Sequence, residues 1–222
     1  MDIQHSLCPS HTALILIGYQ NDYYSSEGIL HKFLEDTPSV RASLRRTVQL
    51  LEHLAPTGIT MIETPIVFTR DYQELQNPVG ILAAIRDAKA FQAGTWGGET
   101  VREFAPFRDR ILSVPGKRGL NAFVGTRLEE TLRARGITDV VLCGSVASIC
   151  IDSTGRHAAE QGYRVAVVGD CITGRTRIEH EFYHQNVFPL YAEVLTAAEL
   201  IGRLVGAPCL AASEERSSWS ES

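Results

Sequence analysis

The amino-acid sequence predicts an α/β fold: a single-domain, doubly wound and mainly parallel sheet of six strands with helices on both faces. Short apolar runs alternate with stretches of helical periodicity, which is the pattern of βαβ units. With 222 residues and 44% hydrophobic content, the chain can bury the core that one such domain needs. The expected strands are residues 13–17, 59–62 with a continuation at 66–68 after Pro65, 111–114, 140–143, 164–168 and 191–194.

Helices are expected between these strands. Apolar residues recur at helical spacing over residues 40–54, 128–132, from Cys150 to the stop at Gly162, and over 197–205. The ends of the chain differ in composition from the middle, and the last residues are rich in Ser and Glu. We therefore expect a mobile N-terminal extension over residues 1–10, one domain over 11–207 and a flexible C-terminal tail over 208–222.

Charge and composition narrow the class of function. A formal net charge of -5 and a pI near 5.8 give no electrostatic reason to bind nucleic acid or an anionic membrane. No apolar run reaches about 18 residues, and no charged segment leads into an apolar one at the start, so neither a membrane span nor a signal peptide is expected. The sequence thus predicts a cytoplasmic protein that acts on a small molecule.

Cys150 is the first candidate for chemistry. A buried strand ends at Cys143-Gly144-Ser145, and a helix restarts with Cys150 in its first turn. Unpaired N–H groups and the positive end of the helix dipole stabilise a thiolate there, which makes the sulfur an effective nucleophile. The alternative is that Cys150 is a small buried hydrophobic residue, as many free cysteines are.

Three motifs in order make the chain resemble the isochorismatase-like cysteine hydrolases, which include nicotinamidases and related amidases. They are the first strand with its exit at residues 13–23, Lys117 followed by Asn-Ala-Phe-Val-Gly-Thr at 121–126, and the Cys150 segment. The resemblance covers roughly residues 12–200. It implies hydrolysis of a C–N bond in a small amide-type substrate through a Cys150 thiolate and an acyl-enzyme, with Lys117 beside the thiolate, no cofactor and a homo-oligomer.

One departure from the family pattern is serious. The catalytic Asp of the family falls at Gly18, so the expected triad of Asp, Lys and Cys contains a glycine in place of the acid. Loss of a positioned acid–base group can cost on the order of 10²–10⁴ in rate. Asp22 is the nearest substitute carboxylate in the sequence, although it matches a second family acid that holds the loop; Glu63 and Asp71 are further candidates.

The resemblance also assigns supporting residues. It implies a cis peptide between Ser145 and Val146, which would direct the backbone N–H groups of Val146 and Cys150 toward one oxyanion. Tyr23 and Trp96 match or resemble family aromatic positions and are candidate walls of the substrate site; the alternative is that both are core residues. No Asp-x-His motif and no zinc-like spacing of Cys and His are present, so we expect no metal and disfavour a nicotinamidase.

Two other functions remain open because of Gly18. A catalytically impaired family member could serve as a binding protein or oligomeric scaffold. A reactive-thiol sensor would use the same activated Cys150 without an acid–base partner. The hydrolase hypothesis instead predicts that turnover depends on Cys150 and that another group supplies the missing proton transfer.

Overall fold

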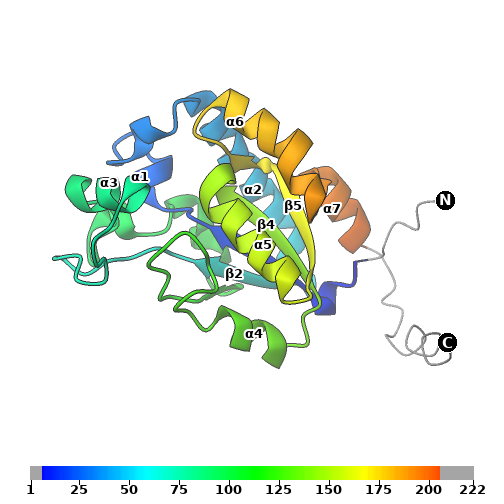
Figure 1. Cartoon of the computed structure of the whole chain (residues 1–222). Coiled ribbons are helices and arrows are strands. Elements are labelled where there is room, and N and C mark those ends of the chain that lie inside the picture. Colours follow the sequence, from blue (N-terminus) through cyan, green and yellow to red (C-terminus); the bar gives the residue numbers. More distant parts are fainter. Residues whose placement is uncertain (1–6, 206–222) are drawn as a thin grey trace.

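A six-stranded parallel sheet forms the centre of the molecule, in a computed structural model that describes residues 7–205 (Figure 1). The strand order is β3-β2-β1-β4-β5-β6, and every pairing is parallel. The predicted doubly wound α/β fold is confirmed. The strands are β1 Thr12–Ile17, β2 Thr60–Thr64, β3 Ile111–Ser113, β4 Asp139–Ser145, β5 Arg164–Thr173 and β6 Glu193–Leu195.

The chain changes direction across the sheet between β1 and β4. From β1 it winds outward through β2 to β3, and from β4 it winds the other way through β5 to β6. Ile17 at the end of β1 lies opposite Gly144 near the end of β4. In open sheets of this kind, ligands bind beyond the carboxyl ends of the strands at this switch point. The topology therefore directs attention to the residues that follow β1 and β4.

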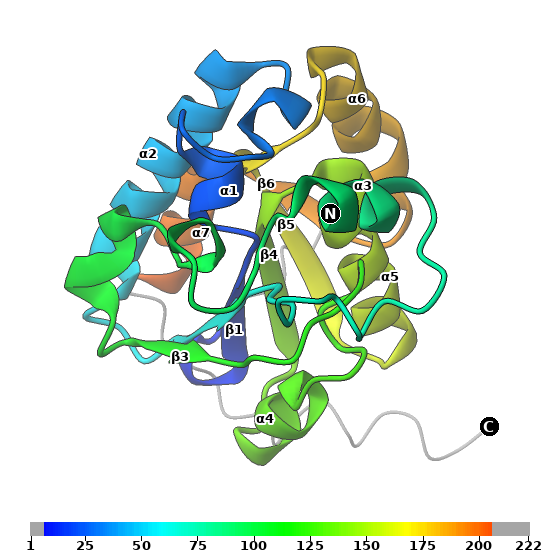
Figure 2. The ribbon, with the colours of Figure 1, turned by 90° about the vertical axis from the view of Figure 1, so that its left-hand side faces the viewer.

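Helices cover both faces of the sheet (Figure 2). The helices α2 and α7 pack with the even-numbered residues of β1, whereas α4 and α5 pack with its odd-numbered residues. Side chains alternate between the two faces along a strand, and since both faces are covered, β1 is buried throughout. The α-helices are α1 Asn21–Tyr24, α2 Thr37–Leu54, α3 Gly80–Ala88, α4 Leu128–Ala134, α5 Asp152–Glu160, α6 Arg177–Phe182 and α7 Ala197–Leu204.

Shorter helical turns connect these elements. Two are π-helical, Ala147–Ile151 and Tyr183–Val187. The others are the 3₁₀ turns Pro9–His11, His31–Phe33, Trp96–Gly98, Arg102–Phe107 and Phe188–Leu190. The first π-helical turn joins β4 to α5 and carries Cys150, so the helical geometry around the candidate nucleophile is wider than that of a regular α-helix.

The structure differs from the sequence expectations at several boundaries. β5 runs five residues beyond its expected end, and β2 ends at Thr64, leaving Ile66 and Phe68 in single bridges only. The last strand begins two residues later than expected, and α3 and α6 were not expected. Leu7 is buried and Ser10 is exposed, and the N-terminal extension over residues 1–10 stays a prediction. Predictions for residues 1–6 and 206–222 lie outside the described part of the chain.

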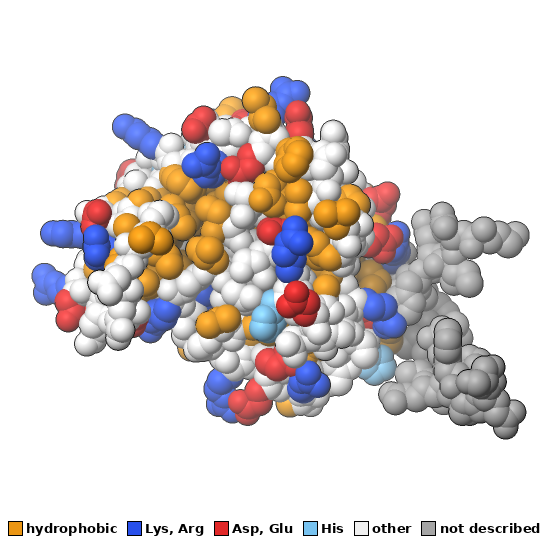
Figure 3. Space-filling view, viewed as in Figure 1, with side chains coloured by type: hydrophobic (Ala, Val, Ile, Leu, Met, Phe, Trp, Pro, Cys, Tyr) orange, Lys and Arg blue, Asp and Glu red, His pale blue; other side chains and the backbone are white. Residues whose placement is uncertain are grey.

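The surface gives further information. Within residues 7–205, no helix has both the length and the apolarity needed to cross a membrane. Figure 3 shows hydrophobic side chains among charged ones on the visible face. Exposed large apolar residues include Ile178 and Phe182 on α6 and Leu190 just after it.

Candidate functional site

Cys150 lies beyond the carboxyl end of β4, as predicted. The strand ends at Ser145, the Ser145–Val146 peptide is cis as the sequence predicts, and the π-helical turn follows at once. The Val146 carbonyl accepts hydrogen bonds from the N–H groups of Ile149 and Ile151, which fixes the start of the turn. The Cys150 side chain is buried, with 7% of its surface exposed. An oxyanion hole formed by the Val146 and Cys150 N–H groups stays a prediction.

Lys117 is the partner of the thiol. Its Nζ donates a hydrogen bond of 2.6 Å to the Gly119 carbonyl and lies 3.4 Å from Cys150 Sγ, within hydrogen-bonding distance for sulfur. The side chain is buried with 1% of its surface exposed, and in the described residues no carboxylate lies within ion-pair distance of it. A buried ammonium without a counter-charge is costly. The Cys150 thiolate is the group in contact that can provide this charge.

The Asn-Ala-Phe segment explains how Lys117 is held there. Asn121 Nδ2 donates to the Ser153 carbonyl, and its Oδ1 accepts from the Phe123 N–H at 2.8 Å. The Ala122 N–H donates to Thr154 Oγ1 at 3.0 Å. These bonds hold the Asn-Ala-Phe segment against the first turn of α5. That turn directly follows the π-helical turn that carries Cys150. The motif thus joins the lysine loop to the cysteine helix.

Gly18 has a backbone that suits glycine. Its φ is +73°, in the left-handed region, and a Cβ atom built on it would lie 2.9 Å from the Ser145 carbonyl oxygen. Both facts disfavour any other residue at this position. The same hypothetical Cβ would lie 3.7 Å from Cδ2 of Tyr23. The position is therefore next to the Cys150 turn, but its local structure does not accommodate an aspartate side chain.

We expect Gly18→Asp to lower stability without increasing activity. The left-handed backbone and the contact with Ser145 together are expected to cost about 1–3 kcal/mol of unfolding free energy. Chemical denaturation of the variant and of Gly18→Ala would measure this, and because the cause is the Cβ atom, both should lose similar stability. An increase in turnover by Gly18→Asp would contradict this expectation and favour an enzyme impaired only by the missing acid.

Asp22 is held by backbone groups. Its Oδ2 accepts from the Phe91 N–H at 2.7 Å, and its Oδ1 accepts from the Ile29 N–H at 3.2 Å. The side chain is buried, and its carboxylate packs closely on Gly97. Both oxygens therefore tie three loops together. A role for Asp22 as the substitute acid stays a prediction that these contacts disfavour.

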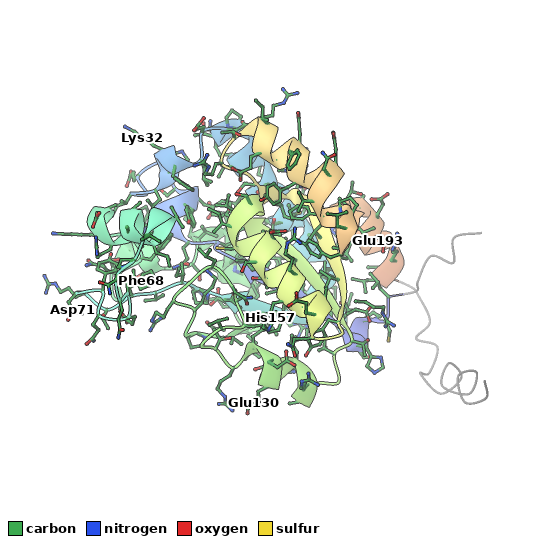
Figure 4. The ribbon with its side chains drawn as sticks, in the orientation of Figure 1. Lys32, Phe68, Asp71, Glu130, His157 and Glu193 are labelled. Carbon is green, nitrogen blue, oxygen red and sulfur yellow. The ribbon has the colours of Figure 1, made fainter. Side chains whose placement is uncertain are left out.

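The two other carboxylate candidates are also engaged or remote. Glu63 Oε2 accepts from the Thr100 hydroxyl at 2.8 Å. Asp71 is exposed, and Figure 4 shows it at the edge of the molecule, far from α5. His157 lies on α5 with its ring stacked on Phe123 at 4.7 Å between centroids. None of these contacts makes one of the three a direct partner of Cys150.

The two predicted aromatic residues have different environments. Tyr23 is buried, packs edge-on against Phe91 at 4.9 Å between ring centroids, and lies close enough to Cys150 for the thiolate charge to affect it. Burial raises the pKa of Tyr23, and the negative charge of Cys150 raises it further. Trp96 is 48% exposed, and its carbonyl accepts from Asn21 Nδ2. Substrate contacts of both residues stay predictions.

Two buried polar groups near the strand ends were not expected. Gln20 makes three hydrogen bonds. Its amide nitrogen donates to the carbonyls of Ile66 and Gly98, and its amide oxygen accepts from the Ile66 N–H. The Ser145 hydroxyl lies 2.7 Å from Tyr24 Oη and 2.6 Å from Thr173 Oγ1. Gln20 belongs to the polar run after β1. The sequence does not indicate its hydrogen-bond partners, which lie up to about 80 residues further along the chain. Both groups fix the backbone around the site.

A cavity of about 500 Å³ lies at the other end of the sheet, lined by Asp139 and Arg164 at the amino ends of β4 and β5 and by Leu190 and Tyr191. It is not the site at Cys150. In residues 7–205, no group of three or more His, Cys, Asp or Glu side chains is arranged as metal ligands.

Comparison with known proteins shows what the chain is similar to. A model of the isochorismatase domain matches residues 12–199. The ureidoacrylate amidohydrolase RutB of Azorhizobium caulinodans is 28% identical over 170 residues, which cover 71% of this chain and 74% of the relative.

Solved structures show the same fold. A cysteine hydrolase from Pseudomonas syringae pv. phaseolicola 1448A superposes with a TM-score of 0.79 at 19% identity, covering 90% of this chain and 95% of its own. The N-carbamoylsarcosine amidase of Thermoplasma acidophilum gives a TM-score of 0.67 at 25% identity, covering 84% and 96% of the two chains.

Proposed function

Because the chain belongs to the isochorismatase family, we propose that it is a cysteine hydrolase that cleaves the C–N bond of a small amide-type substrate. The observation that carries the proposal is the contact between the buried Lys117 Nζ and Cys150 Sγ. Burial leaves the ammonium with the thiolate as its counter-charge, so the pair stabilises the nucleophilic form of the cysteine.

The reaction follows from this arrangement. The Cys150 thiolate attacks the carbonyl carbon, an S–C bond forms, and the π electrons move to the oxygen. The N–H groups of Val146 and Cys150 are proposed to stabilise that oxyanion. The C–N bond then breaks, the nitrogen takes a proton from an acid group in the site and leaves as the amine, and a thioester remains. Water then attacks the thioester and returns a proton to that group, which releases the carboxylic acid and restores the thiolate.

The relatives suggest a class of substrate. The names ureidoacrylate amidohydrolase and N-carbamoylsarcosine amidase both describe compounds with a carbamoyl group on nitrogen. We therefore propose that N-carbamoyl and ureido acids are the first compounds to test, with simple carboxamides as the comparison. The uncharged N-carbamoyl group is compact enough to approach a thiol that is only 7% exposed.

The test is a panel of these amides, with product release followed by mass spectrometry and with the intact protein weighed after rapid quenching. Turnover together with an acyl adduct on Cys150 would support the proposal. An absence of both turnover and adduct across the panel, and also with activated esters, would contradict it and favour the scaffold. Gly18 is the observation that favours this second candidate, since the position holds no acid.

We expect Lys117→Met to slow alkylation of Cys150 by iodoacetamide near pH 7 on the order of tenfold, because loss of the adjacent positive charge destabilises the thiolate. Methionine has a similar shape, so the packing is largely kept. Peptide mass spectrometry would measure the rate, with Cys143 and Cys171 as internal controls. Equal alkylation of the variant and the parent would show that the lysine does not support the thiolate.

The predicted homo-oligomer is also a proposal. The exposed apolar side chains of Ile178, Phe182 and Leu190 provide a surface that a second copy could cover. Light scattering after size-exclusion chromatography would give the mass in solution, and a mass of one chain would contradict the proposal.

A further inference from the structure

Tyr23 is one of three tyrosines that are buried around the end of β1, and it differs from the other two. The Tyr19 hydroxyl bonds with Thr47 Oγ1 at 2.7 Å and donates to the Cys171 carbonyl. The Tyr24 hydroxyl accepts from Ser145. The Tyr23 hydroxyl has no hydrogen-bond partner within residues 7–205, although only 4% of the surface of this residue is exposed.

The Tyr23 oxygen is also not sealed inside the core. Within residues 7–205, the side-chain oxygens of Thr64, Tyr163 and Tyr191 are among those that are both unpaired and fully enclosed. The Tyr23 oxygen is unpaired but not fully enclosed, so it keeps some accessible surface. A buried polar group normally finds a partner within the protein or in what enters the site. The Tyr23 hydroxyl is thus available to a bound molecule.

Two observations place the Tyr23 ring near the Cys150 turn. A Cβ on Gly18 would lie 3.7 Å from the Tyr23 ring, so the ring borders the space that an acid at position 18 would enter. Burial is the main cause that raises the pKa of Tyr23, and the charge of a Cys150 thiolate raises it further, so the ring lies within electrostatic range of the sulfur. The ring is held on its other side by Phe91.

We propose that the Tyr23 hydroxyl carries out the proton transfers for which position 18 holds no group; this inference rests on the proposed hydrolase function. As the C–N bond breaks, the nitrogen takes the Tyr23 proton and leaves as the neutral amine, and Tyr23 becomes a phenolate. The phenolate then takes a proton from the water that attacks the thioester, which restores the hydroxyl. Protons and charges balance over the cycle without an additional reactant.

Acylation itself favours this transfer. In the free enzyme, the thiolate charge opposes a second negative charge on Tyr23. Once the sulfur is part of a thioester, that negative charge is gone. The cost of forming the phenolate therefore falls at the step that releases the amine.

The test compares Tyr23→Phe with the parent on two substrates of the same acyl group, the most active amide of the panel and its p-nitrophenyl ester. The ring and its packing on Phe91 are kept in this variant. p-Nitrophenolate leaves without a proton, so the burst of ester acylation is expected to be unchanged. Amide turnover should fall on the order of 10²–10⁴-fold. Ester turnover after the burst should also fall, because deacylation loses its base.

Tyr163→Phe is the matched control, since it removes another unpaired phenol hydroxyl, on the residue that precedes β5 and lines the cavity at the other end of the sheet. Alkylation of Cys150 should be unaffected in both variants. Unchanged amide turnover by Tyr23→Phe, or equal losses of amide turnover and of the ester burst, would overturn the inference while leaving the hydrolase proposal intact. If the parent protein cleaves neither substrate, the proposed function fails and this role fails with it.

Discussion

Cys150→Ala is expected to reduce amide turnover on the order of 10⁴-fold or more, because no other group can form the thioester. No adduct should then appear on the intact protein. Cys150→Ser is the matched control, since it keeps the size of the side chain but replaces the thiol with a poorer nucleophile. Turnover retained by Cys150→Ala would place the chemistry elsewhere and exclude the proposed mechanism.

The same substitution also reports on the ion pair. Removal of the sulfur leaves the Lys117 ammonium buried with the Gly119 carbonyl as its one hydrogen-bond partner within residues 7–205, so Cys150→Ala should lower the unfolding free energy. In a double-mutant cycle, Lys117→Met should recover part of the loss, with a coupling of about 0.5–3 kcal/mol between the two positions. Additive effects would mean that the two groups are both neutral in the folded protein.

Asp22→Ala is expected to lower the unfolding free energy by about 2–3 kcal/mol, because the buried Phe91 N–H and the partly buried Ile29 N–H both lose their acceptor. Urea denaturation would measure the change. Asp22→Asn keeps one acceptor oxygen and should lose less. The exposed Asp71→Ala should have little effect and controls for the change of charge.

This experiment also decides the role that the sequence suggests for Asp22. If Asp22→Asn keeps its stability but loses amide turnover while ester acylation persists, Asp22 is the substitute acid and the assignment to Tyr23 is wrong. If stability falls and the remaining folded protein keeps its activity, the Asp22 carboxylate stabilises the loops and takes no part in the reaction. The contacts with Phe91 and Ile29 lead us to expect the second result.

Much of the sheet could be predicted because its central strands are long apolar runs between turn residues. The end of β5 could not, because Gly169 and Asp170 interrupt the apolar run although the strand continues through them. The helix α6 has no buried residue, and the apolar face of α3, formed by Ile81, Leu82 and Ile85, extends over only two helical turns, so neither gives a long periodic pattern in the sequence. Short helices of this kind depend on local caps and neighbours more than on periodicity.

For the site, the resemblance correctly brings Lys117 and Cys150 together and gives the cis peptide at Ser145. The consequences of Gly18 could not be predicted, because a sequence shows neither a positive φ nor the position of the Ser145 carbonyl. Tyr23 is a candidate in the sequence as an aromatic wall. Its unpaired hydroxyl becomes visible only when the partners of Tyr19 and Tyr24 are known.

The burial of Cys150 on one side of the sheet has a consequence for oxidation. The other free thiols of the described residues, Cys143 and Cys171, lie in the core cluster on the opposite face. A sulfenic acid formed on Cys150 would therefore have neither of them as a resolving thiol, and further peroxide would convert it to the irreversible sulfinic acid. Reversible signalling needs an internal disulfide or an open approach for glutathione. Within residues 7–205, the fold therefore supplies no free resolving thiol on the face of the sheet that holds Cys150.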